Sequence, residues 1–201
     1  MRGKARRRKG AGRLVLLLGL VAAFLGYVPS EARGPLQRER AIGGIRMYYT
    51  PQNNLAEIDY ALLGSAKFRI DLAAYVLTDR GIMKRLLEAA GRGVKVRLYL
   101  DPDQPAAKSS RPWPEWEALL STRGIEVRAK NGGRDLMHLK AYQMDGRILR
   151  TGAANFSYSG MRRQDNDLLV IESVQLVAQF ISRFNDIWTR PGSEPWPVEP
   201  R

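Results

Sequence analysis

The 201-residue chain has no cysteine and a single histidine, His138. Without cysteine there can be no disulfide, no zinc–thiolate site and no cysteine nucleophile. One histidine excludes a histidine-rich metal site within a single chain, and no acidic residues show the spacing of a Mg²⁺ or Ca²⁺ site. We therefore expect no metal and no other cofactor.

Acidic residues are scarce relative to basic ones. The chain has 33 Lys and Arg against 20 Asp and Glu, which gives a net charge of +13. Seven of the basic residues and one acidic residue precede Arg33, so residues 33–201 still carry +7. A folded part that stays basic favours a polyanionic partner such as nucleic acid, with solubility alone as the alternative.

A long apolar run covers residues 14–28, between a strongly basic segment and the small residues Ser30 and Ala32. This layout is typical of a secretory signal, and it predicts that residues 1–32 are a signal peptide or an N-terminal membrane anchor. The run has 15 residues, whereas a spanning helix needs about 20, so we favour cleavage. The protein is then exported, periplasmic or secreted, with anchoring in the inner membrane as the alternative.

The remaining sequence predicts one domain, at residues 45–190. Residues 33–44 are typical of a linker, and residues 191–201 form a C-terminal tail. Strands alternate with helices, which favours an α/β/α sandwich with helices on both faces of a mixed, mostly parallel central sheet. The expected strands are 45–49, 68–76, 94–100, 125–129, 139–144, 147–151 and 168–171, and the expected helices are 55–66, 79–90, 112–122 and 174–188.

A tight hairpin is predicted where Asp145-Gly146 joins two of these strands. Asp-Gly between apolar runs is a strong hairpin signal, and Asp145 fits the first position of a type I′ turn. The hairpin brings His138, at the mouth of one strand, to the same side as Gly152–Asn155, which follow the other strand.

The residues around this hairpin suit phosphoryl chemistry. Lys140 lies two residues after His138, so in a strand both side chains point to the same face. A cation beside an imidazole favours its neutral, nucleophilic form. Small residues allow backbone to approach a phosphate, while amide and hydroxyl groups can donate to its oxygens. The expected phosphate-binding set is Lys140, Gly152, Ala153, Asn155 and Ser157.

Each of these residues alone has an ordinary structural explanation. A lone histidine is usually structural or merely exposed, and a strand lysine is usually solvated. Asp145 is explained by the turn itself, so a direct role in catalysis is the weaker interpretation for it. The combination of residues, in this order and on a strand–turn–strand segment, favours a catalytic site.

The combination reads H-x-K-x4-D-x6-G-[SA]-x-N from His138 to Asn155. This pattern closely resembles the signature of the phospholipase D superfamily, and a single copy resembles its branch of single-motif bacterial endonucleases. The segments 47–51, 70–75 and 89–97 resemble the upstream landmarks of the same proteins. The resemblance covers residues 45–188, nearly the whole predicted domain.

The resemblance implies a metal-independent phosphodiesterase whose active site lies on the two-fold axis of a homodimer. One protomer's His138 attacks the phosphodiester and forms a phosphohistidine, while the partner's His138 protonates the leaving oxygen and then activates water. Lys140 and Asn155 hold the phosphate oxygens, and Asp145 completes the catalytic candidates. A chain with one imidazole needs a second copy to supply both roles.

Two positions depart from the family pattern. Ala153 replaces the usual serine, which removes one hydroxyl donor. Many members carry Asn-x-Glu where this chain has Gln164-Asp165-Asn166, so the nearest carboxylates are Asp165 and Asp167. These two are the candidates for a carboxylate that orients His138 from behind.

Three functions remain open at this point. The residual charge and the single motif favour an endonuclease that cleaves DNA or RNA. A phospholipid hydrolase of the phospholipase D or cardiolipin hydrolase type would suit an N-terminal anchor. A non-catalytic polyanion-binding module is the third function, and the intact set of catalytic residue types argues against it. The basic residues that flank the motif are Arg134, Arg147, Arg150, Arg162 and Arg163.

Overall fold

The structure, a computed structural model, describes residues 43–106, 108–109, 113–131 and 134–197. The expected signal or anchor segment, 1–32, lies outside these residues, as does nearly all of the expected linker. Within the described ranges, no helix is long and apolar enough to cross a membrane.

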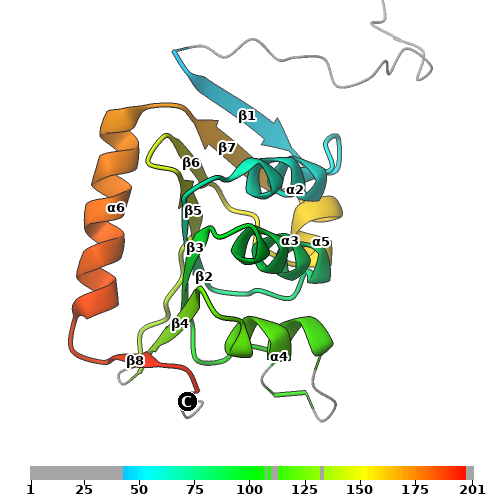
Figure 1. The fold of residues 1–201 in the computed structure, drawn as a ribbon. Helices are drawn as coiled ribbons and strands as arrows, with labels where there is room; N and C mark the ends of the chain where they lie inside the picture. Colours follow the sequence, from blue (N-terminus) through cyan, green and yellow to red (C-terminus); the bar gives the residue numbers. More distant parts are fainter. Residues whose placement is uncertain (1–42, 107, 110–112, 132–133, 198–201) are drawn as a thin grey trace, which may run out of the picture. The chain divides into compact units, whose positions relative to one another are not determined.

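The described residues form a sheet between two layers of helices, which confirms the predicted α/β/α sandwich. The helices are α2 (Leu55–Ser65), α3 (Arg80–Gly91), α4 (Pro114–Ser121), α5 (Tyr158–Arg162) and α6 (Val174–Thr189). Figure 1 shows α6 on one face of the sheet and α2, α3 and α4 on the other. The Asp79 side chain caps α3, because it accepts the Ile82 N–H at 3.0 Å.

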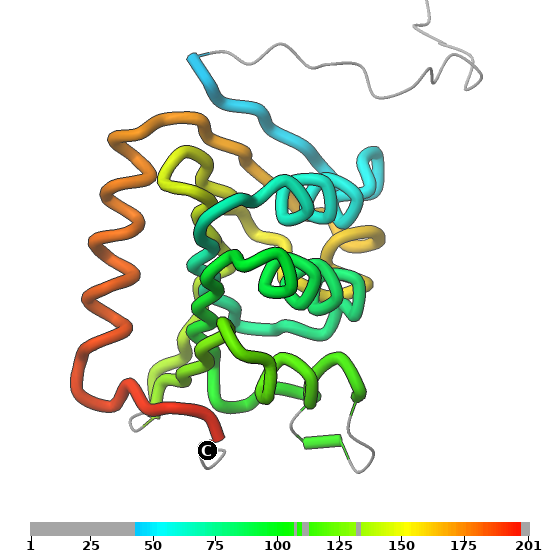
Figure 2. Tube along the Cα trace, viewed as in Figure 1, coloured from blue at the N-terminus to red at the C-terminus, as the bar shows by residue number. Residues whose placement is uncertain are grey.

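The sheet has the strand order β1-β7-β6-β5-β2-β3-β4-β8. The strands are β1 (Ile45–Tyr49), β2 (Arg69–Ala74), β3 (Lys95–Leu100), β4 (Ile125–Lys130), β5 (Lys140–Met144), β6 (Ile148–Thr151), β7 (Asp167–Ile171) and β8 (Ser193–Pro195). Figure 2 follows the trace from blue β1 at one edge to red β8 at the other.

The expectation that the sheet is mostly parallel is wrong. Among the described strands, only β2–β3 and β3–β4 pair in parallel, and the other five pairs are antiparallel. A parallel pair needs a crossover connection, and only α3 and α4 connect neighbouring strands in this way. Most strand pairs are antiparallel because β5 and β6 form a hairpin and because β1, β7 and β8 each run opposite to the strands beside them.

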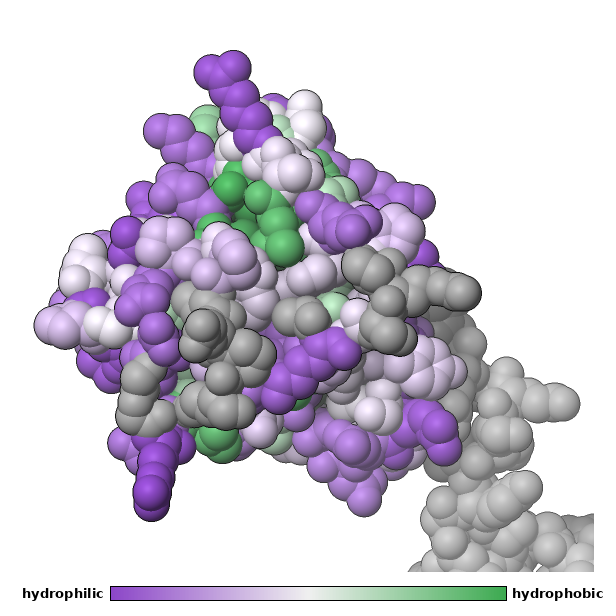
Figure 3. All heavy atoms as spheres, turned by 90° about the horizontal axis from the view of Figure 1, so that it is seen from below, coloured by the Kyte–Doolittle hydropathy of each residue, from purple (hydrophilic) through white to green (hydrophobic). Residues whose placement is uncertain are grey.

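Two short elements lie where the sequence predicted none. The segment expected to be a C-terminal tail contributes β8, which pairs with β4. The helix α5 has five residues, and β8 has three, too few for a hydrophobic period to show. Seen from below, toward the β8 edge in Figure 1, the surface is largely hydrophilic around a small apolar group (Figure 3).

A fully buried ion pair lies between the sheet and α2. Arg150 on β6 donates from Nε to Asp59 Oδ1 and from Nη2 to Asp59 Oδ2, both at 3.0 Å. The Tyr142 hydroxyl donates to the same Oδ1 at 2.9 Å. Burial raises the pKa of Asp59, and the bonds from Arg150 and Tyr142 oppose that shift. Burial also raises the pKa of Tyr142, which keeps its hydroxyl protonated as a donor.

We expect Asp59→Asn to lower the free energy of unfolding by about 3–5 kcal/mol, because it leaves the Arg150 charge buried without a counterion. The matched control is Arg85→Ala, which breaks the half-exposed Arg85–Glu88 pair and should change stability by less than about 1 kcal/mol. Urea denaturation of both variants measures the difference. Equal losses would contradict the importance of the buried pair.

Candidate active site

The motif residues meet at one end of the sheet. β5 begins at Lys140, β6 ends at Thr151 and β7 begins at Asp167, and the antiparallel pairing places these three points at the same end. His138 and Gly152–Asn155 lie just beyond the strand ends. The structure therefore brings the two halves of the motif to the same side, as the hairpin predicted.

An exposed imidazole and a buried ammonium both belong to this group. His138 is exposed, whereas Lys140 is only 9% exposed. Lys140 Nζ donates to the His138 carbonyl oxygen at 2.8 Å. Among the described residues, no Asp or Glu forms an ion pair with Lys140. Burial lowers the pKa of Lys140 because its charge is removed from water.

Arg150 joins the two halves of the motif through their backbones. Its Nη1 donates to the carbonyl oxygen of Lys140 at 2.9 Å and to that of Ala154 at 3.4 Å. Its remaining nitrogens are held by Asp59. From the sequence, Arg150 is one of the basic residues that flank the motif, but in the structure it is fully buried and bonds to both halves of the motif.

A second clamp fixes the chain that leads into His138. Asp101, just after β3, accepts the Met137 N–H at 2.9 Å. Gln104 is fully buried and accepts the Leu77 N–H at 3.0 Å. Its amide nitrogen also donates to the Tyr75 carbonyl oxygen at 2.8 Å. These bonds hold the segments on either side of the imidazole.

Asn155 has a buried hydrogen-bond acceptor that is unsatisfied. In the described ranges, its Oδ1 is the one buried side-chain oxygen or nitrogen with no hydrogen-bond partner. Leaving such an atom without a partner costs about 1–3 kcal/mol. A buried, unsatisfied oxygen at the mouth of the site is typical of a residue that accepts a hydrogen bond from a ligand or from a second chain.

The small residues before Asn155 contact β7. A Cβ at Gly152 would lie 2.5 Å from the Asp167 carbonyl oxygen, and the Gly152 φ is +139°. The Ala153 N–H donates to the Asp167 carboxylate at 2.8 Å. This close approach requires glycine at position 152, and the Asp167 carboxylate holds the backbone of Ala153. A role of Asp167 in orienting His138 stays a prediction.

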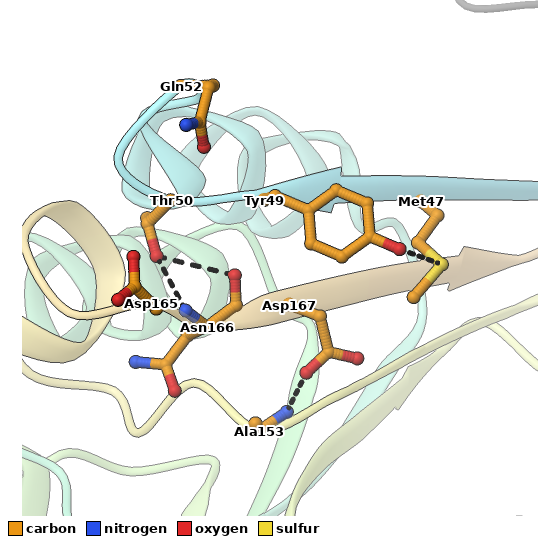
Figure 4. A pocket seen from close by; sticks show the side chains of 8 residues that line it. All are labelled: Met47, Tyr49, Thr50, Gln52, Ala153, Asp165, Asn166 and Asp167. Atoms are coloured by element: carbon orange, nitrogen blue, oxygen red, sulfur yellow. Dashed lines mark hydrogen bonds between the residues drawn. The ribbon is translucent and has the colours of Figure 1, made fainter.

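The last phosphate-site candidate, Ser157, and the carboxylate candidate Asp165 lie close by. Ser157 Oγ accepts the Gly160 N–H at 3.1 Å and so caps α5. Asp165 is exposed and lines a hollow of about 520 Å³ beside Ala153 (Figure 4). The hollow is lined by Met47, Tyr49, Thr50, Gln52, Ala153, Asp165, Asn166 and Asp167.

Asp145 lies at the opposite end of β5 from His138. Its carboxylate accepts the backbone N–H groups of Lys67, Phe68 and Arg69 at 2.8–2.9 Å. Its φ is +56° and that of Gly146 is +67°, which fits the expected type I′ turn. The structure therefore does not bring Asp145 to the group around His138, and it assigns the residue to the turn.

The flanking arginines divide into three sets. Arg134 and Arg163 are exposed at the His138 end of the sheet. Arg147 is exposed at the opposite end, in the hairpin. Arg150 and Arg162 are held in ion pairs with Asp59 and Asp79. Only the first set is placed to meet a polyanion at the site. Within the described ranges, no three His, Cys, Asp or Glu side chains are grouped so that they could hold a metal ion.

Comparison with known proteins identifies the family. Residues 60–188 match the family described as "Cardiolipin synthase, PLD-like domain". The match covers more than half of the chain, so the chain belongs to this phospholipase-D-like family. The predicted membership of the phospholipase D superfamily is confirmed.

Individual relatives agree with this assignment. A protein named mitochondrial cardiolipin hydrolase from Chlamydomonas reinhardtii is 27% identical over 81% of this chain and 71% of its own length. The phospholipase D family member Nuc from Salmonella typhimurium has 23% identity and a TM-score of 0.63, covering 77% of this chain and 98% of that one. NucT from Helicobacter pylori has 18% identity and a TM-score of 0.65, covering 76% and 98%. The two structures confirm the fold, and the matches together support a phosphodiesterase or hydrolase of the phospholipase D type.

The first prediction from the site concerns Asp145. We expect Asp145→Ala to lower the free energy of unfolding by about 2 kcal/mol or more, because three backbone N–H groups lose a charged acceptor. Turnover per folded molecule should stay unchanged. Asp186→Ala, on the exposed face of α6, should change stability by less than about 0.5 kcal/mol. A catalytic Asp145 would instead lower turnover in a fully folded variant.

The second prediction concerns the charge on Lys140. Burial lowers its pKa, so the ammonium loses its proton at a lower pH than an exposed lysine does. Dimethyl phosphate keeps its single negative charge at neutral and alkaline pH. The affinity of the wild type for it should therefore weaken as the pH rises above neutral. Lys140→Arg should keep affinity to higher pH, because a guanidinium stays charged.

Calorimetric titration of the wild type and Lys140→Arg with dimethyl phosphate, from neutral to alkaline pH, measures the difference in affinity. Lys140→Met, which has no charge to lose, should bind weakly at every pH. An unchanged alkaline profile in Lys140→Arg would show that Lys140 does not hold the anion.

Proposed function

We propose that the chain is a metal-independent endonuclease that cleaves DNA, or RNA, through a phosphohistidine in a site shared by two protomers. The observation that carries this proposal is the buried ammonium of Lys140, which forms no ion pair within the described ranges and bonds to the backbone of the exposed His138. Buried charges in proteins are usually paired or neutralised. A bound phosphate anion would supply the missing counterion.

The chemistry requires two imidazoles. His138 of one protomer attacks phosphorus, the bond to the leaving oxygen breaks, and that oxygen takes a proton from the partner's His138. The partner's His138 then takes a proton from water, which attacks the phosphohistidine and releases the second product. One chain has one histidine, so a two-fold axis through the site supplies the second. The exposed position of His138 and the unmet bond of Asn155 support a site that a second copy completes.

Charge favours nucleic acid as the substrate. Residues 33–201 keep a net charge of +7, and Arg134 and Arg163 are exposed at the His138 end of the sheet. Phosphate contacts of this kind give affinity without sequence preference. We further propose that the N-terminal apolar run exports the protein to the periplasm or beyond it.

The test of this function is cleavage of single-stranded DNA, duplex DNA and RNA by the full chain in EDTA. We expect cutting in EDTA, and we expect His138→Ala to abolish it, because both the nucleophile and the acid are lost. Sedimentation should show that the variant keeps the fold and the dimer. Substantial cutting by a folded His138→Ala dimer would end the proposal, and cutting only with added metal would contradict its chemistry.

A salt titration tests the nucleic-acid part separately. We expect Arg134→Glu with Arg163→Glu to weaken DNA binding and to reduce the dependence of log affinity on log salt by roughly 1–2, because each lost phosphate contact reduces it by about 1. Arg147→Glu, exposed at the other end of the sheet, is the matched control. Equal effects of both changes would show that binding does not involve the His138 end.

A phospholipid hydrolase is the second candidate function. It is favoured by the similarity to a protein named mitochondrial cardiolipin hydrolase and by the apolar run at residues 14–28. The same His138 chemistry would act on a lipid phosphodiester. Release of product from cardiolipin vesicles, together with no cutting of any nucleic acid, would favour this candidate over the endonuclease. DNA binding without cleavage of either substrate would favour a non-catalytic module.

A further inference from the structure

One aromatic ring contacts both side chains that carry the proposed chemistry. Tyr75 directly follows the last residue of β2. Its ring centroid lies 4.5 Å from that of the His138 imidazole, with an angle of 54° between the planes. Lys140 Nζ lies 5.0 Å from the same centroid. In the described part of the chain, no other aromatic ring contacts either side chain.

The backbone of Tyr75 is fixed on both sides. Its N–H donates to the Leu139 carbonyl oxygen at 2.9 Å, which ties it to the residue between His138 and Lys140. Its carbonyl oxygen accepts the buried Gln104 amide at 2.8 Å. The ring therefore has a defined place relative to the two side chains, set by the sheet and by a buried side chain.

The ring can act on both groups at once. The face of an aromatic ring carries partial negative charge, so it attracts an ammonium, and the attraction grows when water is excluded. Lys140 is in that position, since it is buried and lacks a carboxylate partner among the described residues. A tilted contact between two rings also favours a limited set of orientations for the imidazole.

We propose that Tyr75 is a positioning residue that holds the His138 imidazole and the Lys140 ammonium in the arrangement that a phosphodiester needs. The reaction itself rests on the proposed function, whereas the contacts of Tyr75 are the same for a nucleic-acid and a lipid phosphodiester. From the sequence, Tyr75 has no role beyond its place in the landmark segment 70–75, because ring contacts do not follow from spacing.

Other charged groups near Lys140 are already engaged. Arg150, which bonds to the Lys140 carbonyl oxygen, is paired with Asp59. Arg162 is paired with Asp79, and Asp101 accepts the Met137 N–H. Among the described residues, the groups that directly favour the charged form of Lys140 are therefore the His138 carbonyl oxygen and the Tyr75 ring. Removal of the ring should lower the pH at which the ammonium loses its proton.

The test compares Tyr75→Phe, which keeps the ring, with Tyr75→Leu, which removes it. Tyr99→Leu is the matched control, because Tyr99 is a buried strand tyrosine that packs against Trp188 and not against the site. The full chain is used without a histidine tag, so that the single histidine gives one imidazole signal by NMR. The three readouts are that signal, dimethyl phosphate affinity against pH, and turnover.

We expect Tyr75→Phe to match the wild type in all three readouts. In Tyr75→Leu, the imidazole signal should move toward that of a free histidine, because the ring-current shift is lost. Alkaline loss of dimethyl phosphate binding should begin at a lower pH, and turnover should fall about tenfold. Tyr99→Leu should lose stability while keeping the imidazole signal and the alkaline profile of the wild type.

Two results would overturn the proposal. One is a Tyr75→Leu protein with the imidazole signal and alkaline profile of the wild type. The other is a Tyr75→Phe protein as impaired as Tyr75→Leu, which would transfer the role from the ring to the hydroxyl. If the wild type cuts no nucleic acid, the endonuclease proposal fails, but the imidazole signal and phosphate binding still decide the role of Tyr75.

Discussion

The buried contact between Arg150 and Asp59 is the interaction on which the site depends. It connects α2 to β6, and the same guanidinium reaches the carbonyl oxygens of Lys140 and Ala154. A buried ion pair contributes little net stability compared with a well-packed apolar replacement. We infer that its contribution here is geometric, because one rigid group sets the distance between the lysine half of the motif and the asparagine half.

That geometry leaves two needs that the single chain does not meet. Lys140 is a buried cation without a carboxylate partner in the described residues, and Asn155 has a buried oxygen without a hydrogen bond. His138 lies exposed beside them and can serve as a nucleophile or an acid, but not as both in one step. An anionic substrate and a second copy of the chain would together meet these two needs and supply the second imidazole. The buried charge of Lys140 and the unsatisfied oxygen of Asn155 thus lower the stability of the fold at the place where binding and catalysis are proposed.

The sequence was sufficient to predict most of the fold and the centre of the site. The Asp-Gly turn and the strand pattern placed His138 beside Gly152–Asn155, because local turn geometry decides that pairing. Mostly parallel pairing was wrong, since strand direction depends on which segments become neighbours across the sheet. Arg150 was misread because its partner Asp59 is 91 residues away. One signal was available: Asp59 is a charge at core-facing spacing on an otherwise apolar helix face.

The central claim is that one active site takes a histidine from each of two chains, and mixed dimers test it most directly. Wild-type and His138→Ala chains are co-expressed in varied ratios, and specific activity is measured against the wild-type fraction. A shared site predicts that activity follows the square of that fraction, because a mixed dimer lacks either its nucleophile or its acid. Activity that follows the fraction linearly would mean that each chain works alone, and it would contradict the account.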